Sequence, residues 1–136
     1  MIYIDMDKWE RKEHFNFFHR MDYPQFNICA NLDVTNFLHY VRTNKLQFYY
    51  AMIHASTSIA NQIINFRYRI REDKVILHGK THPSFTAIED ENDLFKLVTV
   101  EMKDDIFEFA KHAVHIGQYL SELQKYIDYS GKDSLC

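Results

Sequence analysis

The chain has 136 residues, of which 46% are hydrophobic and 15% aromatic, enough large apolar surface to exclude intrinsic disorder and to build one hydrophobic core. Only 3 Gly and 2 Pro occur, which excludes collagenous and Pro-rich low-complexity classes. The net charge of −3, with Lys and Arg scattered among acids, argues against a nucleic-acid partner, because such proteins gather basic side chains on one face.

The distribution of cysteines and apolar residues predicts a cytoplasmic protein. Cys29 and Cys136 lie far apart in the chain and make no metal-ligand spacing, so we expect reduced thiols and no metal. The first nine residues include Asp5, Asp7 and Lys8 and no apolar signal core. No run approaches the roughly 18 apolar residues of a membrane span, so we expect no membrane partner.

The first predicted element is a helix over residues 7–18. Asp5 or Asp7 is its expected cap, because a carboxylate accepts hydrogen bonds from the free N–H groups of a first turn. Tyr23-Pro24 ends this segment.

One strand and two helices are predicted next. Alternating apolar residues predict a strand over 26–32, and Asp33 is the expected N-cap of a helix to residue 44. Helical periodicity predicts a longer helix over 48–63. We expect its buried face to consist of Met52, Ile53, Ser56, Ile59, Ala60 and Ile63.

The following stretch is rich in predicted strands. Strict alternation predicts a strand over 66–71, and Glu72-Asp73 turns the chain into a second strand over 74–78. Another pair is predicted over 84–89 and 94–102, joined by an acidic loop.

The last predicted element is a helix over residues 105–129, with Asp105 as its cap. Its apolar stripe comprises Ile106, Phe109, Ala110, Ala113, Gly117, Leu120, Leu123 and Ile127. The absence of linker-like stretches predicts one domain over residues 1–136. The order of elements predicts an α+β architecture with a mostly antiparallel sheet.

Charged and titratable residues offer only weak functional signals. The eight histidines include His112 and His115 on the last helix and the single His39 and His54 on earlier helices. All four are expected at the solvated surface because no third ligand accompanies them.

Arg67, Arg69 and Arg71 are expected to project from one strand face. Such a stripe fits either an anion site or a solvated sheet face balanced by acids.

Six segments, in order along the chain, resemble the chloramphenicol acetyltransferase family. The most specific is WERKEHF at residues 9–15, which is similar to a W-x-R-K-E-H-F signature. The others are NLDVT at 31–35, FYYAMI at 48–53, NFRYRI at 65–70, FTAI at 85–88 and DDIFEF at 104–109. Tyr50 stands where many members have Pro.

The resemblance implies a trimer of two-layer α+β sandwiches, with helices on one side of the sheet. It implies transfer of an acetyl group from acetyl-CoA to a hydroxyl of chloramphenicol at sites between subunits. By position, Phe17, Phe18, Phe26, Thr86 and Phe95 resemble residues of the drug pocket. Core packing is the other reading of these side chains, and for Phe26 the two readings are evenly matched.

The family's catalytic motif is absent from the 136 residues. No H-H-x-x-x-D-G occurs, so the segment that supplies the general-base His and the oxyanion Ser in the family is missing, and we expect a chain truncated at the C-terminal side. Arg11 resembles the Arg that pairs with the Asp of that motif. We therefore expect Arg11 either to be exposed to water or to meet an acid from another chain.

Two functions follow from this comparison. The first is an acyltransferase of this family, represented by its N-terminal part and inactive by itself, which acts as a homo-oligomer or with a complementing C-terminal chain. The second is a non-catalytic binding or assembly module that keeps the fold without its chemistry. In both cases we predict uncovered apolar surface and association in water.

Overall fold

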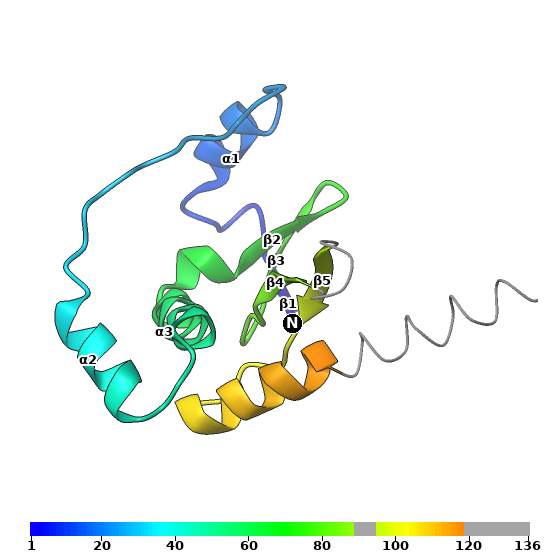
Figure 1. The fold of residues 1–136 in the computed structure, drawn as a ribbon. Coiled ribbons are helices and arrows are strands. Elements are labelled where there is room, and N and C mark those ends of the chain that lie inside the picture. Colours follow the sequence, from blue (N-terminus) through cyan, green and yellow to red (C-terminus); the bar gives the residue numbers. More distant parts are fainter. Residues whose placement is uncertain (89–94, 119–136) are drawn as a thin grey trace, which may run out of the picture.

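The computed structural model describes residues 1–88 and 95–118 and shows an α+β fold (Figure 1). Its helices are α1 (Lys12–Phe18), α2 (Thr35–Thr43), α3 (Phe48–Gln62), the short 3₁₀ helix η1 (Ile64–Arg67) and an unlabelled helix over 106–118. Its strands are β1 (Ile2–Tyr3), β2 (Tyr68–Arg71), β3 (Lys74–Leu77), β4 (Ser84–Ile88) and β5 (Phe95–Thr99). The predicted α+β class is therefore confirmed.

The described strands form two separate antiparallel sheets. One has the order β1-β3-β2, and the other is the β4-β5 hairpin. Both predicted hairpins are confirmed, with Tyr68 opposite Leu77 in the first and Thr86 opposite Leu97 in the second. The two-residue strand β1 is too short for an alternation pattern to predict it. The strand predicted over 66–71 begins only at Tyr68, because Phe66 and Arg67 belong to η1.

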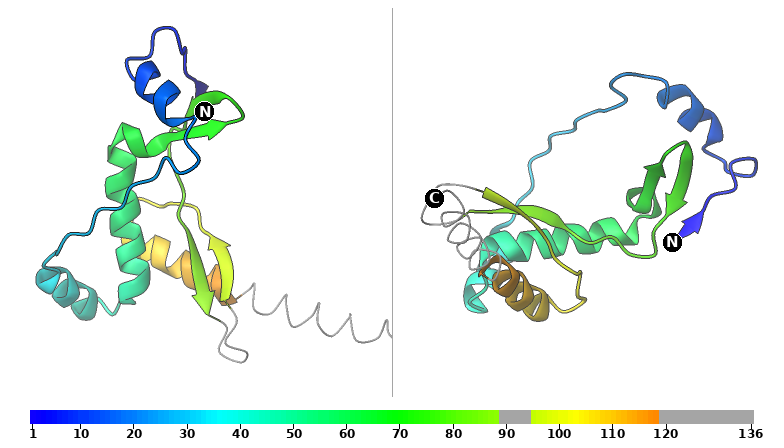
Figure 2. Two further views of the ribbon diagram at one scale, coloured as in Figure 1. Left: turned by 90° about the horizontal axis from the view of Figure 1, so that it is seen from above. Right: turned by 90° about the vertical axis from the view of Figure 1, so that its right-hand side faces the viewer.

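The hydrophobic core lies where α3, the β4-β5 hairpin and the helix over 106–118 meet (Figure 2). Its buried members are Phe85, Val98, Val100, Met102, Phe109 and Ala113, against which Tyr50, Ile53, Ala87 and Ile116 pack. The predicted stripe of the last helix is confirmed for Phe109, Ala110 and Ala113. The part of that stripe beyond residue 118 lies outside the described residues.

Two of the predicted carboxylate contacts are present at helix starts. Asp105 Oδ1 accepts hydrogen bonds from the backbone N–H groups of Phe107 and Glu108, both at 2.8 Å. Asp33 Oδ1 accepts from the N–H of Thr35 at 2.9 Å, but α2 begins at Thr35 with Val34 as its N-cap, so Asp33 lies one residue before the cap.

The first helix is shorter than predicted, and its expected cap is wrong. Turns precede α1, with Asp5 Oδ1 accepting from the N–H of Asp7 at 3.1 Å. The Asp7 carboxylate instead accepts from Lys12 Nζ at 2.8 Å. The helix therefore begins at Lys12, with Arg11 as its N-cap residue and no side-chain cap.

The predicted strand over 26–32 is wrong. Residues 23–34 have no regular secondary structure and run along the periphery from α1 to α2 (Figures 1 and 2). Phe26 is 87% exposed, and Ile28 and Leu32 are also exposed. Alternation does not make a strand without a neighbour to pair its backbone groups, and no described strand lies beside this segment.

The predicted buried face of α3 is confirmed only in part, because Ile53 packs against the core cluster but several other members of that face are exposed. The buried residues of α3 are Ala51 and His54, whereas Ile59 is 58% exposed and Ile63 is exposed. His54 was expected at the surface, yet it is only 8% exposed. The face of α3 with Ala51 and His54 is buried because the β4-β5 hairpin and the helix over 106–118 pack near it. The ring centroid of Phe109 lies 5.4 Å from that of His54.

Candidate functional site

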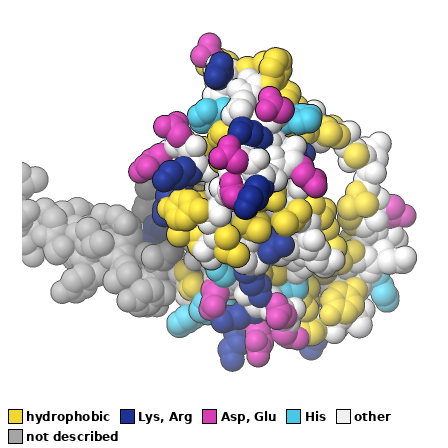
Figure 3. All heavy atoms as spheres, turned by 180° about the vertical axis from the view of Figure 1, so that it is seen from behind, with side chains coloured by type: hydrophobic (Ala, Val, Ile, Leu, Met, Phe, Trp, Pro, Cys, Tyr) yellow, Lys and Arg dark blue, Asp and Glu magenta, His cyan; other side chains and the backbone are white. Residues whose placement is uncertain are grey.

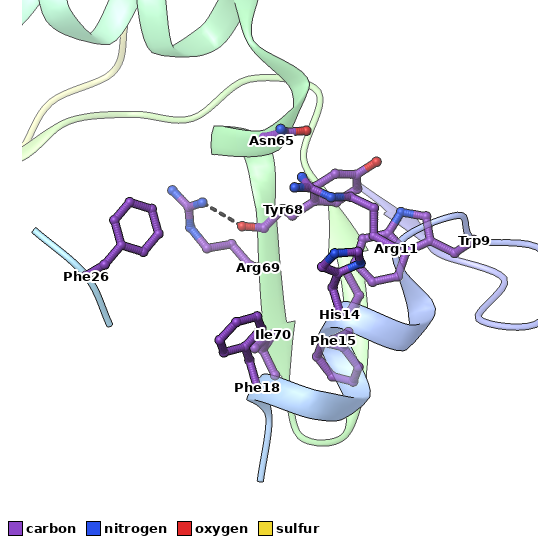
Figure 4. A pocket seen from close by; sticks show the side chains of 11 residues that line it. Trp9, Arg11, His14, Phe15, Phe18, Phe26, Asn65, Tyr68, Arg69 and Ile70 are labelled. Carbon is purple, nitrogen blue, oxygen red and sulfur yellow. Dashed lines mark hydrogen bonds between the residues drawn. The ribbon is translucent and has the colours of Figure 1, made fainter. Parts of the chain in front are cut away.

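A cleft of about 400 Å³ opens between α1, the segment after it, and the β2-β3 hairpin (Figure 4). Side chains from α1, from the residues before and after it, from η1 and from the hairpin converge on the cleft. The lining residues are Trp9, Arg11, His14, Phe15, Phe18, Phe26, Asn65, Tyr68, Arg69, Ile70 and Val75. Concave sites with mostly apolar walls and a few polar groups are typical of small-molecule binding.

Aromatic contacts place α1 against the first sheet. The Trp9 ring meets Tyr68 of β2 edge-on with 5.3 Å between centroids, and Phe15 lies 6.2 Å from Trp9. On the next turn, the ring of Phe15 stacks on His19 at 4.8 Å. Aromatic pairs in such geometries contribute about 0.5–1.5 kcal/mol beyond their burial, so Trp9 fixes one wall of the cleft.

The polar side of the cleft carries basic side chains. Arg11, His14 and Arg69 line it, and none of its described lining residues is Asp or Glu. Arg69 Nη1 donates to the carbonyls of Phe66 and Tyr68, both at 2.7 Å, which holds its guanidinium against the start of β2.

Arg11 is exposed, and no carboxylate of the described residues pairs with it. This is the first of the two environments expected for it. A guanidinium in water carries no desolvation penalty, so Arg11 is available at the mouth of the cleft.

The structure brings some of the predicted pocket residues together and leaves others apart. Phe18 and Phe26 line the cleft with Arg11. Phe17 contacts Phe18 edge-on, with 5.1 Å between ring centroids, in a smaller adjoining hollow. The exposure of Phe26 excludes its reading as a core residue.

Thr86 and Phe95 do not line the cleft, because they lie on the β4-β5 hairpin. Both are exposed, Phe95 at 72%. The carbonyl oxygen of Thr86 accepts a hydrogen bond from the Tyr49 hydroxyl at 2.8 Å. That contact attaches β4 to the start of α3.

Tyr49 was not singled out from the sequence, although it begins an aromatic cluster. Its ring lies 5.6 Å from that of Tyr50, and both meet Phe85 at 5.9 Å. Burial raises the pKa of Tyr50 above its usual value, and the neighbouring Tyr49 adds to the shift. The adjacent Tyr49-Tyr50 pair at a helix start was the available signal.

The three arginines predicted on one strand face do not form a stripe. Arg67 lies in η1, and its guanidinium donates to the carbonyls of Gly79 at 2.8 Å and His78 at 3.4 Å. Arg69 is engaged with local carbonyls as described above. The chain turns at η1, so β2 begins at Tyr68 and the alternation is broken before Arg67.

No cluster of three or more metal-ligating side chains occurs within residues 1–88 and 95–118. In the same part of the chain, no helix is long and apolar enough to cross a membrane.

An aromatic cleft bordered by two arginines has the kind of lining that small-molecule sites have. Comparison with known proteins gives its family. The family model described as "Chloramphenicol acetyltransferase" matches residues 1–134, and the chain belongs to this family.

Individual relatives agree with this assignment. A chloramphenicol acetyltransferase from Klebsiella is 31% identical over 106 residues, 78% of this chain and 48% of the relative. Chloramphenicol acetyltransferase 3 from Escherichia coli is 26% identical over 123 residues, 90% of this chain and 55% of the relative. A solved chloramphenicol acetyltransferase superposes with a TM-score of 0.78 at 27% identity, covering 93% of this chain and 64% of that one.

The chain thus spans about half the length of the curated relatives it matches. The WERKEHF segment, on which the resemblance depends most, supplies Trp9, Arg11, His14 and Phe15 to the cleft. The most specific motif in the sequence and the aromatic cleft are therefore the same region of the molecule.

Proposed function

We propose that this chain is the N-terminal part of an acyltransferase that moves an acetyl group from acetyl-CoA to a hydroxyl of a chloramphenicol-like drug. The observation that carries the proposal is the family match over residues 1–134, together with the aromatic cleft that the family's signature segment builds. In this proposal the role of the 136 residues is to bind the drug, because its aromatic ring can pack against the aromatic side chains of the cleft.

In the family reaction, a His takes the proton of the drug hydroxyl while its oxygen attacks the thioester carbonyl. The C–S bond then breaks and coenzyme A leaves as the thiol, with a Ser holding the oxyanion. The 136 residues contain no H-H-x-x-x-D-G motif. We therefore assign no catalytic residue to this chain and propose that by itself it transfers no acetyl group.

The proposed substrate-binding residues fall into two groups. Phe17, Phe18 and Phe26 form the wall at the cleft and its adjoining hollow. Thr86 and Phe95 lie on the separate hairpin, and in a family trimer the pocket lies between subunits. We propose that the hairpin of one subunit faces a site at its neighbour, so that one chain contributes to two pockets.

The complete assembly would be a cytoplasmic trimer of two-layer sandwiches, in which the 136 residues form part of one domain. Exposed Arg11 supports this arrangement, since an acidic side chain from a C-terminal segment would pair with it. The exposed side chains Phe95 and Leu97 on the outer face of β5 support it too, because a continued fold would cover them.

The DNA immediately downstream of the codon for Cys136 tests the proposal. An in-phase open frame that encodes H-H-x-x-x-D-G is the expected result. A frame without this motif would contradict the acyltransferase and leave the non-catalytic binding module as the function. In that case the purified chain would bind chloramphenicol, and Phe18→Ala would weaken binding more than Phe107→Ala on the far helix.

A further inference from the structure

Two histidines from different elements contact consecutive residues of the connection between β5 and the helix over 106–118. His82 Nδ1 lies 3.0 Å from the backbone nitrogen of Met102. His54 Nε2 of α3 lies 3.0 Å from the carbonyl oxygen of Lys103. Neither contact belongs to the cleft, and the proposed function uses neither.

The two imidazoles play opposite roles in these contacts. A backbone N–H can only donate, so His82 Nδ1 must be the unprotonated acceptor. A carbonyl can only accept, so His54 Nε2 must carry the proton and donate it. Protonation of the ring turns both nitrogens into donors. It therefore abolishes the His82 bond and leaves the His54 bond intact.

The bond to Met102 holds a segment on which the core depends. Val100 and Met102 are buried members of the core cluster, and the N–H of Val100 donates to the carbonyl of Pro83, the residue next to His82, at 3.1 Å. His82 and Pro83 thus hydrogen-bond to Met102 and Val100, which are alternate residues of the segment that follows β5. An orphaned Met102 N–H would cost about 1–3 kcal/mol if it stayed buried, so the segment must shift to reach water.

The charged groups around His82 favour such an opening. Glu101 interacts electrostatically with His82, with His112 on the core helix and with Lys103, whose Nζ it binds at 2.6 Å. A protonated His82 would therefore be attracted toward this carboxylate.

The surroundings of His54 are different. Asp104 interacts electrostatically with it, but that carboxylate is bound by Lys80 Nζ at 2.7 Å. Glu108 is the further acid in this region, and it interacts with Lys103.

We propose that His82 is an acid-sensitive clip, which holds residues 100–104 to the loop before β4 while its ring is neutral and releases them when the ring is protonated. His54 is the acid-insensitive partner that keeps the segment attached to α3. Protonation of the His82 ring is the trigger, so the clip opens as the pH falls.

Amide hydrogen exchange of the 136-residue chain, followed by NMR from about pH 8 to about pH 5, tests the proposal. After correction for intrinsic exchange, protection of the Met102 amide should fall about tenfold per pH unit below the titration midpoint of His82, as the neutral fraction does. The Val100 amide, bonded to a carbonyl, should keep its protection. Equal behaviour of the two amides would overturn the clip.

The matched variant is His82→Asn, whose side-chain oxygen stands where Nδ1 does and accepts at every pH. Its Met102 amide should keep its protection in acid, whereas His112→Gln should behave like the wild type. An acid-induced loss in His82→Asn equal to that of the wild type would refute the role of His82.

If His82→Asn fails to fold, an NMR titration of the wild-type chain tests the proposal by itself. The Met102 amide shift and the His82 ring shifts must titrate with one midpoint, and a Met102 shift that does not change while the ring titrates would contradict the clip.

Discussion

Phe109 is 0% exposed and packs its ring against His54, so the core and the buried histidine depend on one side chain. Phe107, two residues earlier on the same helix, is 44% exposed. The two phenylalanines differ in environment and not in type, which makes them a matched pair.

We predict that Phe109→Ala lowers the free energy of unfolding by about 3–5 kcal/mol, because the lost ring leaves a cavity in the core. Phe107→Ala should lower it by about 1 kcal/mol or less, since the Phe107 side chain is exposed and its loss leaves no cavity in the core. Urea unfolding followed by circular dichroism measures both. Equal losses would contradict the assigned core.

Asp104 gives the clearest pH dependence at the residue scale. The hydrogen bond from Lys80, and then its charge, hold the pKa of Asp104 below its ordinary value of 3.8. A lowered folded-state pKa means that the ionised form is stabilised by folding. This contribution is present above pH 3.8 and is lost as the pH falls through the lower folded value.

We therefore predict that Lys80→Gln is less stable than the wild type at neutral pH and that the difference vanishes once the pH falls below the lowered pKa of Asp104. The pair is exposed, so the effect is small. Thermal unfolding midpoints of the two proteins across pH test this. A stability difference between the two proteins that grows as the pH falls would contradict the prediction.

At the scale of elements, Asp105 determines where the core helix begins. Its carboxylate satisfies two N–H groups of the first turn, and the helix it starts carries Phe109 and Ala113 into the core. Helix start and core packing are thereby coupled.

Asp105→Ala should lower the free energy of unfolding by about 0.5–2 kcal/mol through loss of the cap. Asp105→Ser keeps an oxygen acceptor and should recover most of that loss. Chemical denaturation of the three proteins is the measurement. A Ser variant as unstable as the Ala variant would show that the carboxylate acts in some other way.

Hairpins and the last helix were predictable from the sequence because local rules determine them. Alternation and the Glu72-Asp73 turn placed β2 and β3, and the cap at Asp105 placed a helix start. The same rules failed for residues 26–32, where Phe26 and Ile28 alternate as in a strand but have no strand beside them among the described residues. Pairing is a property of tertiary structure.

The site was harder to predict than the elements. The buried face of α3 was predicted only in part because apolar residues surround the helix, so periodicity alone could not choose the side on which Phe109 packs. Family resemblance identified Phe18 and Phe26, which do line the cleft. It could not show that Tyr49 holds β4, since that contact joins residues 37 positions apart.

At the scale of the whole molecule, apolar side chains remain uncovered on several surfaces. Figure 3 shows hydrophobic side chains exposed between interspersed acidic and basic groups on one face. Phe95 and Leu97 are exposed on β5, Ile59 on α3, and Ile63 directly after α3. Exposed apolar patches and open strand edges favour association.

We predict that the 136-residue chain forms oligomers or aggregates at tens of micromolar, because association buries these side chains. Light scattering after size-exclusion chromatography measures the mass. The paired change Phe95→Lys and Leu97→Lys should shift the distribution toward the monomer, whereas Lys74→Gln, which removes no apolar side chain, should leave it unaltered. A well-behaved wild-type monomer would contradict the prediction.

Thiol release from acetyl-CoA in the presence of chloramphenicol and the purified 136-residue chain tests the central claim most directly. A general base is worth about 10²–10⁴ in rate, and the chain contains no family motif to supply one. We predict no release above the reaction without protein. Turnover near that of a full-length family member would contradict the account and show that another histidine of this chain performs the chemistry.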